Sequence, residues 1–493
     1  MKIEICNLND ISRAEIDLRP LTIFIGPNNM GKTWIAYILS GIFGLRGWEE
    51  YSQAYARGQL PKSYPSLDAA IEDVLAKGNA TIDLYKLAEE YGEIYFQNVA
   101  DYARNWMNDY METQLANFSN MKVSINLAEI KAVFLEQVEK YPLLIRVAGG
   151  LFTIRKEQDD KTLYAFTSIE GEEQLAEKLS VEEIKYRLVR SIFRVLHQSL
   201  YPNVRVFPTE RTTLVTFPFG SRTSGKVPRP LDRNTLDALE TLEKTLQKIQ
   251  NLSGLTPSTT IERNARATIG PVANFLDMMS AVFRIGSQQM EERKAKAKND
   301  LRIQKYIDLA EILENQILSG RLAFSTPEPD PRRDILFQAT QDVTLEIPIV
   351  SSMIKELAPL VFYLRYLAEP GELLIIDEPE MNLHPAVQMQ IIEFLAMLVN
   401  AGLHVLITTH STYVIDHLTN LMDAYRHKNQ DEIAEMFLLE QKEAFISQEK
   451  VSVYLVEDGK VKNVLDPEGI IDWKTFSDVT TLVERIHFEL LGA

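Results

Sequence analysis

The sequence predicts an α/β fold in which a mixed β-sheet is flanked by helices. Two observations carry this prediction. Near the N-terminus the β-branched and aromatic run "LTIFIG" ends in a glycine-containing loop, and the apolar-periodic "KTWIAYILSGIFG" follows. Far along the chain, the apolar runs "LLIID" and "LHVLITTHS" stand on either side of the helical pattern "PAVQMQIIEFLAMLVNAG". Short apolar runs that alternate with helices are typical of buried parallel strands.

The first half of the chain adds further strands and helices to this frame. "KIEICNL" and "AEIDLRPLTIFIG" alternate like strands. From about 45 to 142 the chain is polar and aromatic with helical spacing, which favours a partly buried helical face over the alternative, a base-stacking surface. "LLIRVAGGLFTIRKEQDDKTLYAFTSIEG" predicts strands joined by a polar turn, and "VEEIKYRLVRSIFRVLHQSLY" predicts an amphipathic helix. A strand in "NVRVFPTERT" and a loop in "FPFGSRTSGKVPRPL" follow.

Two helical stretches and a hairpin complete the list of elements. The first helix has an apolar seam at 3-4-3 spacing, formed by Leu239, Leu242, Leu246 and Ile249. The second long helix, "MEERKAKAKNDLRIQKYIDLAEILENQIL", carries a basic patch of Arg293, Lys294, Lys296 and Lys298. We interpret that patch as a solvated helix face, and nucleic-acid contact is the alternative. "VSVYLVEDGKVKNVLD" predicts a hairpin around Asp458-Gly459.

Composition narrows the functional classes. The net charge of −17 disfavours long-range attraction to nucleic acid or to anionic lipid. Cys6 is the only cysteine, so intrachain disulfides and cysteine-cluster zinc sites are excluded. The first residues do not read as a signal peptide, and no run of 18 apolar residues occurs. We therefore expect a cytoplasmic protein without a membrane span.

The loop after "LTIFI" matches the pattern G-x-x-x-x-G-K-S/T, the P-loop. In such a loop the backbone N–H groups and the helix N-terminus bind phosphates, the lysine neutralises the β- and γ-phosphates, and the threonine ligates Mg²⁺. We therefore expect nucleotide binding, with Mg²⁺ at Thr33. The predicted phosphate-binding residues are Gly26, Pro27, Asn28, Asn29, Gly31, Lys32 and Thr33.

Acidic and histidine side chains follow the two later strands. Asp377 emerges at the end of "LLII" as a candidate Mg²⁺ ligand, and Glu378 is the candidate general base for an attacking water. His410 ends "LITTH", where it can hydrogen-bond a γ-phosphate. Because ligands bind at the carboxyl ends of parallel strands, these residues should converge with the P-loop.

Taken together, the P-loop, "IIDEPE", "MNLHP" as a D-loop and "TTHS" as a histidine switch resemble an ABC-type ATPase head. "IGPNNMGKT", "VFPTERT" and "SSMIKELAPLVFYLRYLAEPGELLIIDEPEMNLHP" resemble the SMC/RecF/OLD branch (OLD, overcoming lysogenization defect). The resemblance covers residues 1 to 44, about 200 to 225 and about 335 to 420. It implies ATP and Mg²⁺ as cofactors and an ATP sandwich between two copies of the chain, with higher homo-oligomers as a further option.

The resemblance also assigns residues. It implies that Ser351 or Ser352, at a helix start, contacts ATP bound to the opposite protomer. Met353 replaces the glycine that usually follows, which departs from the signature pattern. Gln53 and Gln97 are available for a glutamine loop. Arg211 matches a recurring family position, which implies a residue behind the ATP site or at the interface between the two protomers.

The motifs divide the chain into head segments and insertions. We predict the P-loop part of the head in 1–44, a mainly helical insertion in 45–199 with a strand pair near 143–168, and a return to the head in 200–225. A helical insertion with a short hairpin then occupies 230–322. The head with signature, Walker B, D-loop and histidine switch occupies 323–425, and a C-terminal helix and hairpin occupy 426–493.

Three functions remain open at this point. The first is an ATP-hydrolysing switch that regulates or scaffolds a separately encoded effector, such as a nuclease, in prokaryotic antiviral defence, as the resemblance to OLD-like ATPases implies. We expect no Toprim nuclease in this chain, since "YLVEDGK" is followed by few residues and no D-x-D. The alternative is a RecF/SMC-like clamp on duplex DNA, which the charge disfavours. A transporter subunit is the third, and the missing signature glycine argues against it.

Overall fold

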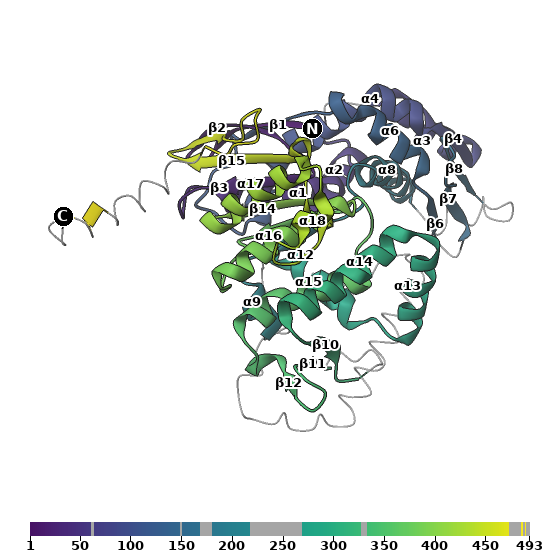
Figure 1. Ribbon diagram of the computed structural model, residues 1–493. Helices are drawn as coiled ribbons and strands as arrows, with labels where there is room; N and C mark the ends of the chain where they lie inside the picture. The colour runs from purple at the N-terminus through teal and green to yellow at the C-terminus, as the bar shows by residue number, and fades with distance from the viewer. Residues whose placement is uncertain are drawn as a thin grey trace, which may run out of the picture.

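A computed structural model describes residues 1–60, 64–147, 150–167, 180–216, 269–326, 333–472, 485–486 and 489. The described residues form a mixed sheet of nine strands, in the order β5-β1-β2-β16-β15-β3-β14-β13-β9. Figure 1 labels β1, β2, β3, β14 and β15 of this sheet. This arrangement confirms the predicted α/β class. The strands are β1 (Lys2–Leu8), β2 (Ile11–Asp17), β3 (Leu21–Ile25), β5 (Lys122–Asn126), β9 (Val204–Phe207), β13 (Leu373–Asp377), β14 (His404–Thr409), β15 (Val451–Glu457) and β16 (Lys460–Asn463).

The centre of the sheet is a block of parallel strands, β15, β3, β14, β13 and β9. In this block Asp377 on β13 pairs in register with Thr408 on β14, and Thr409 pairs with Ile25 on β3. The carboxyl ends of three strands that are distant in sequence therefore meet at one edge, which is where a ligand site is expected in a parallel sheet.

Helices cover both faces of this block. Helix α1 packs on one face, and Ile375 and Leu406 point toward it in one apolar cluster. The opposite face packs against α15, α16 and α17 through Leu374 and Ile407 among others. These strands are apolar on both faces because both faces are covered. The helices are α1 (Lys32–Phe43), α9 (Arg211–Thr216), α15 (Ser352–Tyr366), α16 (Pro385–Asn400), α17 (Thr412–Arg426) and α18 (Gln430–Ala434).

The first insertion contains a second sheet, in the order β4-β8-β7-β6. We predicted a strand pair near 143–168; the structure has three strands there, and β4 joins them. Tyr51, Tyr64 and Tyr95 are buried around Phe193, which confirms the interpretation of the aromatic residues as a helical packing face. The elements are β4 (Asn79–Asp83), β6 (Leu143–Val147), β7 (Phe152–Lys156), β8 (Thr162–Thr167), α2 (Leu45–Ala56), α3 (Pro65–Lys77), α4 (Leu84–Ala103), α5 (Met107–Tyr110), α6 (Lys131–Lys140) and α8 (Val181–Gln198).

One strand of this insertion belongs to the main sheet. β5 pairs antiparallel with β1, so that Ile125 lies opposite Ile3. The sequence division into head and insertion did not anticipate this pairing, because the partner of an isolated short strand depends on tertiary packing.

The second insertion is described from residue 269 onward, so the predicted seam of Leu239, Leu242, Leu246 and Ile249 lies outside the described residues. We predicted one long helix from Met290, but the helix is interrupted at Asp300, which has an extended backbone. The Asp300 carboxylate caps the next helix by accepting a hydrogen bond from the Arg302 N–H. The elements are α12 (Gly270–Phe283), α13 (Ser287–Asn299), α14 (Leu301–Ile312), a π-helical turn (Leu313–Leu318), β10 (Arg321–Phe324), β11 (Ile335–Gln338) and β12 (Thr344–Glu346).

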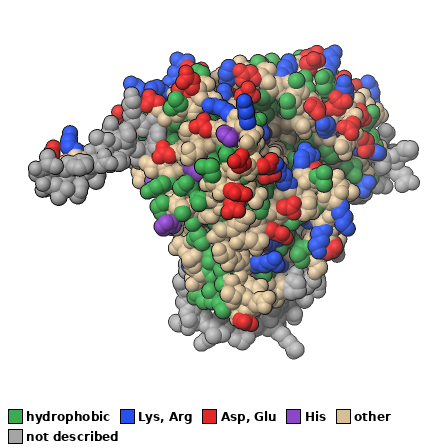
Figure 2. All heavy atoms as spheres, viewed as in Figure 1, with side chains coloured by type: hydrophobic (Ala, Val, Ile, Leu, Met, Phe, Trp, Pro, Cys, Tyr) green, Lys and Arg blue, Asp and Glu red, His purple; other side chains and the backbone are tan. Residues whose placement is uncertain are grey.

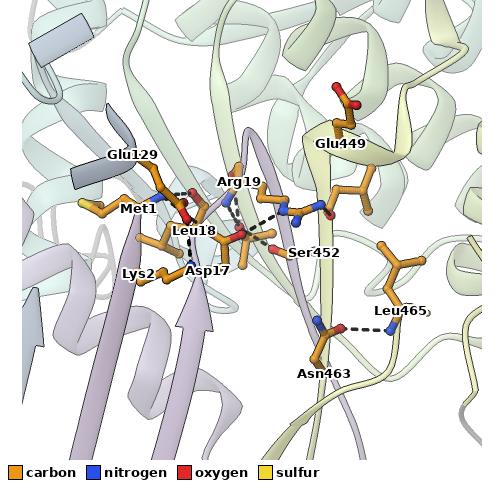
Figure 3. Close-up of polar contacts among 12 residues, drawn as sticks. Met1, Lys2, Asp17, Leu18, Arg19, Glu129, Glu449, Ser452, Asn463 and Leu465 are labelled. Atoms are coloured by element: carbon orange, nitrogen blue, oxygen red, sulfur yellow. Dashed lines mark hydrogen bonds and ion pairs between the residues drawn. The ribbon is translucent and has the colours of Figure 1, made fainter. Parts of the chain in front are cut away.

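The predicted C-terminal hairpin is present, and it forms part of the main sheet. β15 and β16 pair around Asp458 and Gly459, which both have positive φ, and the hairpin lies between β2 and β3. At the opposite end of β15, Arg19 donates to the Asp17 carboxylate at 3.0 Å (Figure 3). Arg19 also donates to the carbonyl of Val451 at 3.2 Å. These bonds join the N-terminal strands to the C-terminal hairpin.

The connection between β2 and β3 differs from the prediction of one continuous strand. The two strands are separated at Pro20, which has no N–H to donate to a ladder. Across the described ranges, no helix combines the length and the apolar character needed to cross a membrane.

Candidate functional site

The P-loop, residues 26–33, joins the carboxyl end of β3 to helix α1. Gly26 has φ 139°, and a Cβ built there would lie 2.3 Å from the carbonyl oxygen of Val456 on β15, so no larger residue fits. Gly31 precedes the helix with φ 94° and offers no side-chain cap. The first N–H groups of α1 are therefore left for another acceptor, as in sites that bind phosphate.

Lys32 lies folded against this loop. Its side chain is 5% exposed, and Nζ donates to the carbonyls of Gly26 at 2.9 Å and of Pro27 at 2.7 Å. Burial lowers the pKa of Lys32, and the nearby carboxylates of Glu378 and Asp377 oppose that shift. A cation is thus held at the loop, with weak carbonyl acceptors that a phosphate can replace.

Asp377, at the end of β13, accepts hydrogen bonds from three hydroxyl groups. Its Oδ1 accepts from Thr33 Oγ1 at 3.0 Å and from Thr408 Oγ1, and its Oδ2 accepts from the Tyr37 hydroxyl at 3.2 Å. Burial raises the pKa of Asp377, and the hydroxyl hydrogen bonds oppose the shift. Neighbouring ligands of an octahedral Mg²⁺ at ~2.1 Å are about 3 Å apart, so the Thr33 and Asp377 oxygens fit one ion.

Two glutamates and a histidine lie next to Asp377. Glu378 has the left-handed φ of 49°, which is uncommon for this residue type, and its N–H donates to the carbonyl of Thr408 at 3.1 Å. His410 Nδ1 lies 3.4 Å from Glu378 Oε1 and 3.5 Å from Glu380 Oε1. The contact with Glu378 raises the pKa of His410, and His410 lowers the pKa of Glu378. Glu378 is thus ionised and partly exposed, as a general base must be.

Arg211 hydrogen-bonds the backbone at the carboxyl end of β13. Its guanidinium, 2% exposed, donates to the carbonyls of Asp377 at 2.6 Å and Glu378 at 2.7 Å. The same group forms an ion pair with Glu356 on α15, and Thr212 donates to that carboxylate. Burial raises the pKa of Glu356 and Arg211 opposes that shift. The backbone of the acidic motif is therefore tied to α15.

Helix α15 begins at the predicted signature. Ser351 is its N-cap, accepting from the Ile354 N–H at 3.4 Å, and Ser352 is its first residue. Both serines are exposed, and within the described part of the chain we find no hydrogen bond that joins either of them to the P-loop. Met353 is half-buried on the apolar side of the helix.

The profile of the AAA ATPase domain matches residues 1–415, which include every residue of this centre. The chain belongs to that family. It is therefore an ATP-binding ATPase. Among proteins of curated function, none matches the chain.

Two solved structures are similar to this AAA ATPase at 12% identity. One is the Smc head domain with an extended coiled coil bound to the C-terminal domain of ScpA from Pyrococcus furiosus, with a TM-score of 0.34, covering 99% of this chain and 98% of that one. The other is the SmcHead bound to the C-winged helix domain of ScpA, with a TM-score of 0.33 and coverage of 95% and 98%.

Most of the residues that the sequence suggested for the ATPase lie together. Lys32, Thr33, Asp377, Glu378 and His410 converge at the carboxyl ends of β3, β13 and β14. The two signature serines are not joined to them. Gln97 is committed elsewhere, since its amide donates to the Val123 carbonyl at 2.9 Å and accepts from the Ile125 N–H at 3.1 Å.

Three further residues of the centre escaped the sequence analysis. Tyr37 lies one helical turn after Thr33, a spacing that places both on one face of α1 and that was available as a signal. Thr408 is opposite Asp377 only because β13 and β14 are parallel in that register. Glu380, the last residue of "DEPE", is buried at 3% exposure although its neighbours gave no sign of it.

The basic patch on α13 is largely neutralised within the fold. Arg293 is buried, and it donates to the Ala368 carbonyl at 2.6 Å and pairs with Glu369. Lys296 pairs with the same carboxylate, and Lys294 pairs with Glu291. Figure 2 shows Lys and Arg side chains interspersed with Asp and Glu on the visible face. The predicted solvated face is therefore correct for the lysines and wrong for Arg293.

Proposed function

We propose that this AAA ATPase hydrolyses ATP at the centre formed by the P-loop, Asp377, Glu378 and His410. The contact of Thr33 with Asp377 across 344 positions of sequence is the observation that carries the proposal. Gly26 to Gly31 and the start of α1 bind the phosphates, and Lys32 exchanges its carbonyl acceptors for the β- and γ-phosphates. Mg²⁺, held by Thr33 and Asp377, supplies neutralisation of the charge on those phosphates.

Glu378 acts as the general base in this proposal, and His410 hydrogen-bonds the γ-phosphate. Glu378 is 24% exposed and ionised, so it can accept a proton from a water beside the γ-phosphate. His410 is 41% exposed and sits next to it, where a protonated ring donates to an anion.

The ATP-bound form is a head-to-head dimer of this chain. The exposed serines at the start of α15 support this, because a helix N-terminus with free donors suits a phosphate on another copy. The ion pair of Glu356 with Arg211 links α15 to the backbone of Asp377 and Glu378 in the same chain. Dimer contacts and hydrolysis are coupled through that link.

The dimer serves as a switch for a separately encoded effector in prokaryotic antiviral defence. This part of the proposal rests on the resemblance of the motifs to OLD-like ATPases without a Toprim domain. The two insertions offer the surface for the effector, which we expect to be a nuclease. Mass spectrometry of proteins that co-purify with the Glu378→Gln variant identifies that partner.

The basic patch on α13, which was the observation in favour of the DNA-clamp alternative, no longer supports it. Of the four basic residues on α13, three are paired with acidic residues of the same chain. A clamp that depended on phosphate contacts would show binding to duplex DNA that falls steeply with salt. Such binding by the ATP-bound protein would restore the alternative.

The Glu378→Gln variant tests the proposed reaction. We expect it to bind ATP with near wild-type affinity and to lose at least about 100-fold in kcat, because the base contributes roughly 10²–10⁴ in rate. With Mg²⁺ and ATP it should elute as a dimer that persists, whereas the wild type returns to the nucleotide-free form. Turnover at the wild-type rate would remove Glu378 from the role of base.

A further inference from the structure

Glu380 is a buried carboxylate at the edge of the ATPase centre with no assigned role. Its side chain is 3% exposed. Oε1 accepts two hydrogen bonds from the end of β14, from Thr409 Oγ1 at 2.6 Å and from the His410 N–H at 2.9 Å. Oε2 is buried, and among the described residues no donor reaches it. Burying a carboxylate with one oxygen unpaired costs stability, so its presence at a site calls for a functional reason.

The same carboxylate faces the ring of His410. Nδ1 lies between two acidic oxygens, 3.5 Å from Glu380 Oε1 and 3.4 Å from Glu378 Oε1, and neither contact is a well-formed hydrogen bond. Glu380 thus contacts His410 twice, at the backbone N–H and at the Nδ1 edge. These contacts leave Nε2 on the edge of the ring that faces away from the carboxylates.

The two glutamates differ in a way that separates their roles. Glu378 is 24% exposed and can contact bulk water, whereas Glu380 is 3% exposed and is buried away from it. Burial raises the pKa of Glu380, with the hydrogen bonds from Thr409 and from the His410 backbone opposing that rise. A group that touches neither substrate nor water acts on the reaction only through its neighbour.

We propose that Glu380 is a positioning residue for His410, holding its backbone and its Nδ1 edge so that Nε2 presents a donor to the γ-phosphate. The inference rests on the proposed function, since it needs His410 at the γ-phosphate. With ATP bound, Nδ1 donates to the carboxylates and Nε2 donates to the phosphate, which requires the imidazolium. The charges that face the ring are Glu378, Glu380 and Lys32.

Glu380→Gln tests the proposal, because the amide keeps an oxygen for Thr409 and the His410 N–H and removes only the charge. We expect the dissociation constant for ATP to stay within about twofold and kcat to fall about tenfold, a coupling typical of groups in direct contact. We also expect the alkaline limb of the pH profile to move: as pH rises, kcat should start to fall at a lower pH in the variant than in the wild type. Without the negative charge of Glu380, His410 loses its proton more easily.

A double-mutant cycle separates action through His410 from a merely structural effect. If Glu380 acts through His410, adding Glu380→Gln to His410→Ala costs no further activity. Additive losses, or wild-type kcat with an unshifted pH profile in Glu380→Gln, overturn the proposal. If Glu380→Gln does not fold, Thr409→Val provides the test, since it removes one hydrogen bond to Glu380. An unchanged kcat and an unchanged pH profile in Thr409→Val would also overturn the proposal.

Glu393 provides a matched control. It is a fully buried glutamate on α16 that contacts His417 at 2.6 Å and accepts the backbone N–H groups of Leu438 and Leu439. Glu393→Gln should lower stability without a specific change in kcat or in its pH profile. The proposed function is judged separately, by ATP binding in Lys32→Ala and turnover in Glu378→Gln, so the Glu380 proposal can fail while that function stands.

Discussion

At the scale of residues, a few hydrogen bonds position the side chains of the ATPase centre. Asp377 gathers three hydroxyl donors, and Lys32 rests on two carbonyls of its own loop. In each of these bonds one partner is charged and the other is neutral. A phosphate at Lys32 or a cation at Asp377 can replace the neutral partner, because two opposite charges attract more strongly than a charge and a neutral dipole. These hydrogen bonds hold Lys32 and Asp377 where we propose that the phosphates and Mg²⁺ bind.

Lys32→Ala should abolish measurable ATP binding. The lysine supplies the only side-chain cation in contact with the loop carbonyls of Gly26 and Pro27 within the described residues, and nothing nearby replaces its charge. We expect the dissociation constant to rise at least about 100-fold, as for lost charged hydrogen bonds of ~3 kcal/mol. Isothermal titration with ATP and Mg²⁺ measures this. Affinity equal to that of the wild type would contradict the P-loop assignment.

At the scale of elements, helix α15 connects the proposed dimer contact to the backbone of the proposed general base. Its first turn presents Ser351 and Ser352 to solvent, and one turn later Glu356 is buried against Arg211. Arg211 in turn holds the backbone that follows β13. A displacement of α15 in a dimer would therefore reach Glu378 through one ion pair.

Ser352→Arg should block the ATP-dependent dimer while leaving ATP binding intact. The larger, positively charged side chain would stand at the start of α15, where we propose that the second protomer binds. Light scattering with Mg²⁺ and ATP, in a Glu378→Gln background, should give the monomer mass. Leu301→Arg is the control, since Leu301 is 81% exposed at the start of α14. A Ser352→Arg dimer that forms as readily as in this control would place the interface elsewhere.

At the scale of the whole molecule, the buried His197 makes stability depend on pH. Burial lowers the pKa of His197 to about 4, from an ordinary value near 6.5. Between these values the unfolded chain binds a proton that the folded chain does not, so stability falls as pH decreases from about 6.5 toward 4. The loss is up to about 1.4 kcal/mol for each pH unit in that window.

Urea unfolding at pH 7 and pH 5 measures this dependence. We expect the free energy of unfolding of His197→Gln to fall less between the two pH values than that of the wild type, even if the variant is less stable at pH 7. His427→Gln, at an exposed position, is the control and should keep the wild-type difference. An equal difference in the His197 variant and the wild type would show that His197 does not remain neutral in the folded state.

Prediction from sequence succeeded where local patterns suffice. The strand, loop and helix around residues 21–43, the strand before Asp377 and the strand before His410 each carry their own signal in apolar periodicity. The helix break at Asp300 and the placement of β5 next to β1 escaped prediction, because a local cap and a distant partner strand outweigh periodicity. Glu380 escaped for a related reason, since only the fold encloses it.

The sequence by itself determined the phosphate loop, the acidic strand end and the histidine strand end, because each depends on residues adjacent in the chain. The sequence also predicted that these segments converge, but only the tertiary structure decided which of their side chains contact one another. The parallel register of β3, β14 and β13, fixed by helices packed on both faces, brings Thr33 to Asp377 and His410 to Glu378 and Glu380. That register arises from burial of apolar surface over the whole sheet, which no single segment encodes.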